Sequence, residues 1–208
     1  MIFEAVTHLK KGGLVAFPTE TVYGLGADAR NPAAVAEIFR IKERPADVPL
    51  TVHLGSQLDP NLWAFVSPEA AKVMDAFWPG PITLILPKTP TVPDIVVAGG
   101  PTVGLRMPSH PLCDEFLNTF GGGVAAPSAN RHRGLSPTSA EHVREEFGTS
   151  LPYILDGGPC QVGLESTVLW MAGGPPRILR HGAITTDKIE ACLGIALSPT
   201  ALPGRSYR

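Results

Sequence analysis

The chain has 208 residues, 44% hydrophobic and 17% charged, and this length and composition predict one compact domain with a sizeable core. Its formal net charge of −2 argues against a protein whose main role is to coat nucleic acid, because such proteins are basic. Three cysteines without C-x-x-C spacing disfavour structural zinc and a disulfide framework, and they favour a reducing cytoplasm. No apolar run reaches the roughly 18 residues of a membrane span, and Glu4 precedes the first lysines, the reverse of a secretory signal.

Short apolar segments bounded by proline and glycine predict the elements of the first half of the chain. Asn31-Pro32 and Ser67-Pro68 each place a capping side chain before a proline at the first helical position, so both predict helix starts. Pro45 ends the first of these helices, because the residue before proline avoids the helical region. In chain order we expect a helix up to Gly12-Gly13, a strand over 14–17, a helix from 32, a strand over 50–54, a helix over 68–77 and a strand over 82–86.

The second half predicts more strands, some of them consecutive. We expect a capping box over 138–141, in which Glu141 reaches back to the cap at Thr138. The expected elements are strands over 103–107, 123–126, 153–155, 166–170 and 177–179, a helix over 112–120, one after the capping box, and one capped by Thr186 that ends at Gly194. Alternating strands and helices followed by consecutive strands predict an α/β domain over 1–197, with a parallel and antiparallel sheet flanked by helices. Residues 198–208 are expected to be a flexible tail or the start of a linker.

The segment from Gly24 to Ala29 fits the dinucleotide pattern G-x-G-x-x-G/A, but its context is wrong. That pattern needs the glycines at the end of a strand and a helix directly after them. Here six residues separate Phe17 from Gly24, and the helix cap comes only at Asn31, so a nicotinamide site is disfavoured. The chain also lacks the P-loop, G-x-S-x-G and H-E-x-x-H patterns.

Polar and cationic side chains instead gather at the ends of the predicted strands and helices. Taken singly, each has an ordinary explanation: His53 as a satisfied core histidine, Lys42 and Arg44 as a solvated helix end, and Arg180 as an exposed strand end. Arg106 differs, because it lies within an apolar strand and needs an anion or a carboxylate. Open α/β sheets bind ligands at such ends, and several cations with few acids nearby favour a polyphosphate or carboxylate ligand.

Six motifs in a fixed order give the chain a specific resemblance. FPTETVYGLG, Lys42-x-Arg44, PLTVHL, VGLRMP, APSAN followed by GLSPT, and ESTV followed by ILRHG resemble the YrdC/Sua5 family of threonylcarbamoyl-adenylate synthases, from about residue 5 to about residue 195. The resemblance implies a twisted mixed sheet around a concave, positively lined cleft. It implies that L-threonine, bicarbonate or CO₂, and ATP with Mg²⁺ give L-threonylcarbamoyl-AMP and pyrophosphate. A tRNA threonylcarbamoyl transferase complex would then use the product to modify adenosine 37 of tRNA.

The resemblance also implies roles for individual residues. Lys42 and Arg44 would be catalytic, with no metal site built by the protein alone. Gly24 and Gly26 would let the chain turn tightly against the floor of the cleft. The residues implied around L-threonine are Thr21, His53, Arg106, Ala126 and Ser166, and those around ATP are Arg44, Thr102, Ser128, Asn130, Ser136 and Arg180.

Two positions depart from the family pattern. Asparagine is usual where this chain has Val48, so one polar contact to ATP is expected to be missing. Arg131, His132 and Arg133 stand where small residues are usual, and this basic spot allows a weak RNA contact. It also keeps open an alternative function, a non-catalytic RNA-binding module. A third reading keeps the fold but changes the acceptor, as in carbamoyl-transfer relatives.

Overall fold

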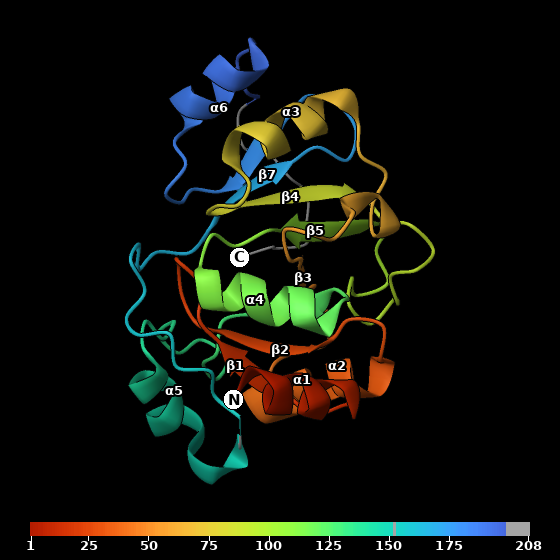
Figure 1. The fold of residues 1–208 in the computed structure, drawn as a ribbon. Helices are drawn as coiled ribbons and strands as arrows, with labels where there is room; N and C mark the ends of the chain where they lie inside the picture. Colours follow the sequence, from red (N-terminus) through yellow and green to blue (C-terminus); the bar gives the residue numbers. More distant parts are fainter. Residues whose placement is uncertain (152, 199–208) are drawn as a thin grey trace.

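A computed structural model of the chain describes residues 1–151 and 153–198, which form one α/β domain around an eight-stranded mixed sheet (Figure 1). The strand order is β1-β2-β6-β3-β5-β4-β7-β8. β3 runs parallel to β5 and β4 parallel to β7, and the other neighbouring pairs are antiparallel, which confirms the mixed sheet. The strands are β1 (Val15–Phe17), β2 (Gly24–Asp28), β3 (Thr51–His53), β4 (Ile82–Pro87), β5 (Thr102–Arg106), β6 (Val124–Ala125), β7 (Thr167–Trp170) and β8 (Arg177–Arg180).

Helices flank this sheet at both ends and on its faces (Figure 1). Helices α1 and α4 pack against each other near β1, where they enclose the smaller of two hydrophobic clusters. Helices α3 and α6 pack together near β4 and β7, and α2 packs on β2. The described residues contain α1 (Ile2–Lys10), α2 (Pro32–Lys42), α3 (Pro68–Phe77), α4 (Pro111–Phe120), α5 (Ala140–Phe147), α6 (Thr186–Leu193) and the 3-10 turns η1 (Pro60–Leu62) and η2 (Gly148–Ser150).

The capping predictions are confirmed for two helices and wrong by one residue for two others. Asn31 accepts hydrogen bonds from the amides of the first turn of α2, and Ser67 does the same for α3. Helix α5, however, is capped by Ser139, which accepts from the His142 amide at 3.3 Å, so the box expected at Thr138 is wrong. The cap of α6 is Thr185 in place of Thr186.

Strand β2 is the element that the sequence analysis missed. Gly24 and Gly26 lie within this strand and do not form the expected turn. A Cβ on Gly26 would lie 2.6 Å from Val124 Cγ1 and 2.8 Å from Phe17 Cε1, because the Phe17 ring of the neighbouring strand packs directly over the glycines. Side chains are therefore excluded here by close packing and not by backbone conformation.

Near the C-terminal end, two backbone contacts tie the last described residues to the domain. The Leu197 amide donates to Glu190 Oε1 at 2.7 Å, and the Ser198 amide donates to the Pro176 carbonyl at 3.1 Å. The rest of the predicted tail, 199–208, lies outside the described residues. Of the strand expected over 153–155, only a single bridge between Ile154 and Ala16 is present.

Candidate active site

One pocket lies at the edge of the sheet where β3 and β5 end and where β4 and β7 begin. The topology produces this meeting point: His53 pairs with Arg106 at the parallel ends, while antiparallel β4 starts beside the end of β5. The segments after β1 and β6 and the end of β8 complete the wall. The pocket has a volume of about 120 Å³.

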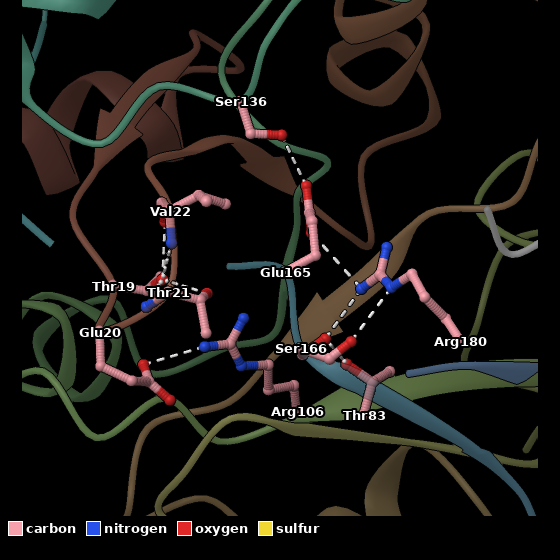
Figure 2. A network of polar contacts seen from close by, with 10 residues as sticks. All are labelled: Thr19, Glu20, Thr21, Val22, Thr83, Arg106, Ser136, Glu165, Ser166 and Arg180. Carbon is pink, nitrogen blue, oxygen red and sulfur yellow. Dashed lines mark hydrogen bonds and ion pairs between the residues drawn. The ribbon is translucent and has the colours of Figure 1, made fainter. Parts of the chain in front are cut away.

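Arg106, at one end of the pocket, forms a buried ion pair with Glu20. Its Nη2 lies 2.9 Å from Glu20 Oε2, and the side chains are 5% and 6% exposed (Figure 2). The contact joins charges without an aligned hydrogen bond, since both Glu20 oxygens and Arg106 Nε and Nη2 lack a hydrogen-bond partner. Arg106 thus has its charge compensated by Glu20, and because its side chain also borders the pocket, the guanidinium can bind a carboxylate ligand there.

His53 lies beside Arg106 and lines the same end of the pocket. Burial, and then the Arg106 guanidinium, lower the pKa of His53 to about 3. The ring is therefore neutral near pH 7, and its buried Nδ1 makes no hydrogen bond within the chain. A neutral imidazole in this place can donate a hydrogen bond to a small polar ligand or accept one from it.

The segment after β1 is held by a compact set of hydroxyl contacts. Thr19 Oγ1 lies 2.9 Å from Thr21 Oγ1, donates to the Val22 carbonyl at 2.6 Å, and accepts from the Thr21 and Val22 amides (Figure 2). Thr19 and Val22 line the pocket, whereas Thr21 is fully buried behind them. The hydroxyls therefore shape this wall in addition to any contact that they make with a ligand.

Arg180 and Ser166 form the opposite side of the pocket. Arg180 donates through Nε to the Ser166 carbonyl and through Nη2 to Ser166 Oγ, both at 3.0 Å. Ser166 Oγ also lies 2.8 Å from Thr83 Oγ1 on β4 (Figure 2). Burial lowers the pKa of Arg180, and the nearby Glu165 carboxylate opposes this shift. These contacts fix a guanidinium at the pocket wall, and Arg44 adds a second one there.

Lys42 is almost fully buried in the wall behind the cations, and it does not border the pocket. Its Nζ donates to the backbone carbonyls of Ser128 and Asn130. Burial, and then the neighbouring Arg44 charge, lower the pKa of Lys42 to about 7. The two Lys42 contacts tie the end of α2 to the segment after β6. Within that segment, the Asn130 side chain donates to the carbonyls of Arg131 and Gly134.

The structure brings most of the predicted site residues to this place. The predicted residues that line the pocket are His53, Arg106, Ala126, Ser166, Arg44, Ser128 and Arg180. Asn130 and Ser136 line a neighbouring hollow that shares Val22 and Glu165 with the pocket. Thr102 lies at the opposite end of β5 from Arg106, on the same face of the sheet.

Five polar residues of the site were not predicted: Thr19, Glu20, Thr51, Thr83 and Glu165. Glu20 was half foreseen, because the strand-interior Arg106 calls for an anion. The partner itself comes from the segment after β1, far away in the chain, and no local pattern identifies it. Glu165 is the first residue of the ESTV motif, which does not predict its place among the cations; that place follows from the tertiary fold.

Two further expectations bear on metals and nucleic acid. Among the described residues, no cluster of three or more His, Cys, Asp or Glu side chains could hold a metal ion. In the basic spot, Arg131 is paired with Glu43 at 2.5 Å, and its amide donates to Glu146.

Within residues 1–151 and 153–198, no helix is both long and apolar enough to cross a membrane.

Comparisons with known proteins agree on one family. A family model for Sua5, YciO and YrdC proteins, described as telomere recombination, matches residues 7–182. The chain is 43% identical over 203 residues to threonylcarbamoyl-AMP synthase of Pyrococcus abyssi, covering 97% of this chain and 60% of the relative. It is 48% identical over 196 residues to threonylcarbamoyl-AMP synthase of Bacillus subtilis, covering 93% and 56%. The chain thus spans less than two thirds of the length of these relatives.

A solved structure gives the same result. The crystal structure of P. abyssi Sua5 complexed with L-threonine superposes with a TM-score of 0.92 at 42% identity. The superposition covers 100% of this chain and 64% of that one. Together with the matched family model, this likeness shows that the chain belongs to the YrdC/Sua5 family.

Proposed function

We propose that this chain is an L-threonylcarbamoyladenylate synthase, which converts L-threonine, bicarbonate or CO₂, and ATP to L-threonylcarbamoyl-AMP and pyrophosphate. The observation that carries the proposal is one pocket with the Arg106 guanidinium at one end and Arg44 and Arg180 at its walls. That arrangement suits one small carboxylate and one polyphosphate. Relatives at 43% and 48% identity bear the corresponding name, and a related Sua5 holds L-threonine.

The threonine carboxylate would bind the Arg106 guanidinium at its end of the pocket. His53, Ala126 and Ser166 would surround the rest of the amino acid, with Thr21 supporting the wall from behind. Its methyl group would fill an apolar part of this space. Because one methyl group is worth only about 1–3 kcal/mol, serine should be a poorer substrate without being rejected.

ATP would occupy the cationic side. Arg44, Ser128 and Arg180 would contact it from the pocket, with Asn130 and Ser136 in the neighbouring hollow and Thr102 further along the face. A carbamate formed on the threonine amine attacks the α-phosphate, and pyrophosphate leaves. Such a transfer depends on positioning and charge neutralisation more than on a strong base. Mg²⁺ would enter with ATP and be held mainly by phosphate and water oxygens.

Lys42 would act on this reaction from within the wall. Because its Nζ holds the carbonyls of Ser128 and Asn130, it fixes the segment that presents Ser128 to the nucleotide. Lys42→Ala should therefore lower turnover more than it lowers substrate affinity. We further propose that the product passes to a tRNA threonylcarbamoyl transferase complex in the cytoplasm.

The test is pyrophosphate release by the purified chain with ATP, Mg²⁺ and bicarbonate, with and without L-threonine. Release should depend on both threonine and bicarbonate. Arg106→Ala should mainly remove threonine binding, and Arg44→Ala should mainly remove nucleotide binding. Arg144→Ala is a matched control, because this exposed arginine pairs with Asp156 away from the pocket. Threonine-independent release, or full activity in both pocket variants, would refute the function and the site.

RNA binding is tested separately by a salt titration. Phosphate-driven binding at Arg131, His132 and Arg133 should weaken steeply as salt rises. The Arg131–Glu43 ion pair already neutralises one of these charges, so any RNA contact is expected to be weak. Tight, salt-sensitive RNA binding in a chain without pyrophosphate release would favour the RNA-binding alternative.

A further inference from the structure

Glu165 is an acidic side chain set among cations. Its Oε1 accepts a hydrogen bond from Ser136 Oγ at 2.7 Å, and its Oε2 lies 3.4 Å from Arg180 Nη2 (Figure 2). Ser136 lies between β6 and α5 and Arg180 ends β8, so the carboxylate joins two separate parts of the chain. Among the described residues that line the pocket, Glu165 is the only acid, and it also borders the neighbouring hollow.

Ser136 and Arg180 are also two of the groups implied for ATP. Carboxylate and phosphate oxygens accept from the same serine hydroxyl and guanidinium donors. Glu165 therefore occupies donors that a polyphosphate would need. The Glu165 carboxylate also acts on two other cations: burial lowers the pKa of Lys42 and of Arg44, and the negative charge of Glu165 opposes both shifts.

We infer that Glu165 is an internal competitor of the polyphosphate: it holds Ser136 and Arg180 and must be displaced from them when triphosphate or pyrophosphate binds. This inference rests on the proposed function and adds the residue that limits polyphosphate affinity. The Glu165 side chain is 36% exposed, so the displaced carboxylate can turn into water without being stranded in the interior. As pyrophosphate leaves, Glu165 can take Arg180 back, which favours release of this product.

The test measures the affinity of the full chain for inorganic pyrophosphate by isothermal titration calorimetry in Mg²⁺-free buffer. Glu165→Gln keeps the size of the side chain and its acceptor for Ser136 but removes the charge. Removing one like charge several ångströms from phosphate, at the effective dielectric of a protein surface, should tighten binding about tenfold. Glu165→Asp keeps the charge and should stay close to wild type.

Glu145→Gln is the matched control. Glu145 is an exposed acid on α5 that borders the neighbouring hollow, so its loss changes net charge equally without freeing Ser136 or Arg180. We expect a change of less than about twofold, because exposed charges are screened by water and salt. Equal tightening in this control would overturn the inference, since a general charge effect would then explain the result.

The remaining outcomes separate this inference from the proposed function. If wild type binds pyrophosphate and Glu165→Gln binds no tighter, the competitor role is wrong and the function stands. Weaker binding of Glu165→Gln in a repeat with Mg²⁺ would also overturn it, because Glu165 would then contact the metal. Absence of pyrophosphate and ATP binding in wild type and variant alike would overturn both. Glu165→Ala, expected to tighten binding likewise, replaces the glutamine variant if circular dichroism shows that the latter is unfolded.

Discussion

Replacing Glu20 with glutamine removes the buried negative charge beside Arg106 and keeps the side-chain size. The two charged ends lie 2.9 Å apart with side chains 5% and 6% exposed, so water cannot compensate the guanidinium that remains. Breaking such a pair by removing one partner destabilises a protein by about 3–5 kcal/mol. With an unfolding entropy of about 2.1 cal/mol/K per residue over 208 residues, the melting temperature should fall by about 7–11 °C.

Differential scanning calorimetry measures this change. Glu37→Gln is the control, because Glu37 pairs with Arg40 on the surface of α2, where the side chains are 39% and 71% exposed. That pair should contribute less than about 1 kcal/mol, or roughly 2 °C. A Glu20→Met/Arg106→Met double variant should recover most of the lost stability, since no unpaired charge is then buried. A Glu20→Gln loss no larger than that of the control would refute the reasoning.

Three further predictions test other features of the domain. His53 has a pKa of about 3 in the folded chain and about 6.5 when unfolded, so the unfolded state binds more protons between these values. The free energy of unfolding should therefore fall by about 1.4 kcal/mol per pH unit as pH drops below about 6.5. Denaturant titrations at a series of pH values should show that this free energy depends less steeply on pH in His53→Asn. Gly26→Ala should destabilise the domain by about 1–3 kcal/mol, because its Cβ would meet the Phe17 ring at 2.8 Å; unchanged chemical denaturation would contradict this. Val48→Asn, next to the pocket residue Pro49, should lower the Michaelis constant for ATP about two- to tenfold, the range for one hydrogen bond, and no change would mean that the position does not face the nucleotide.

Much of the fold was predictable where one physical rule dominates. Asn31 and Ser67 each precede proline, and both cap helices as expected. Strand β2 was missed because glycine is depleted in strands, and the reason for its glycines is the Phe17 ring on the neighbouring strand. The cap of α5 was expected at Thr138, but the pattern has two adjacent hydroxyl residues, and in the structure the second of them, Ser139, provides the cap.

The site divides in the same way. The place of Arg106 in an apolar strand predicted an anionic partner, and in the structure this partner is Glu20. The sequence could not show that Lys42 turns inward to backbone carbonyls, since a helix-end lysine is equally suited to solvent. The contacts of Glu165 could not be predicted either, because its partners Ser136 and Arg180 are brought together only by the tertiary fold.

The pocket is complete only once β4 and β7 have paired, because both strands contribute residues to its lining. Ile82 pairs with Thr167, so this corner of the sheet forms by closing a very long loop, whereas β7 and β8 pair locally. Such non-local parallel contacts form slowly, because the chain entropy of the loop must be lost before the contacts stabilise it. Before β7 and β8 join the sheet, the chain would hold Arg106 without Ser166 and Arg180 in place. Recovery of ligand binding after refolding should therefore lag behind recovery of helical and strand signals.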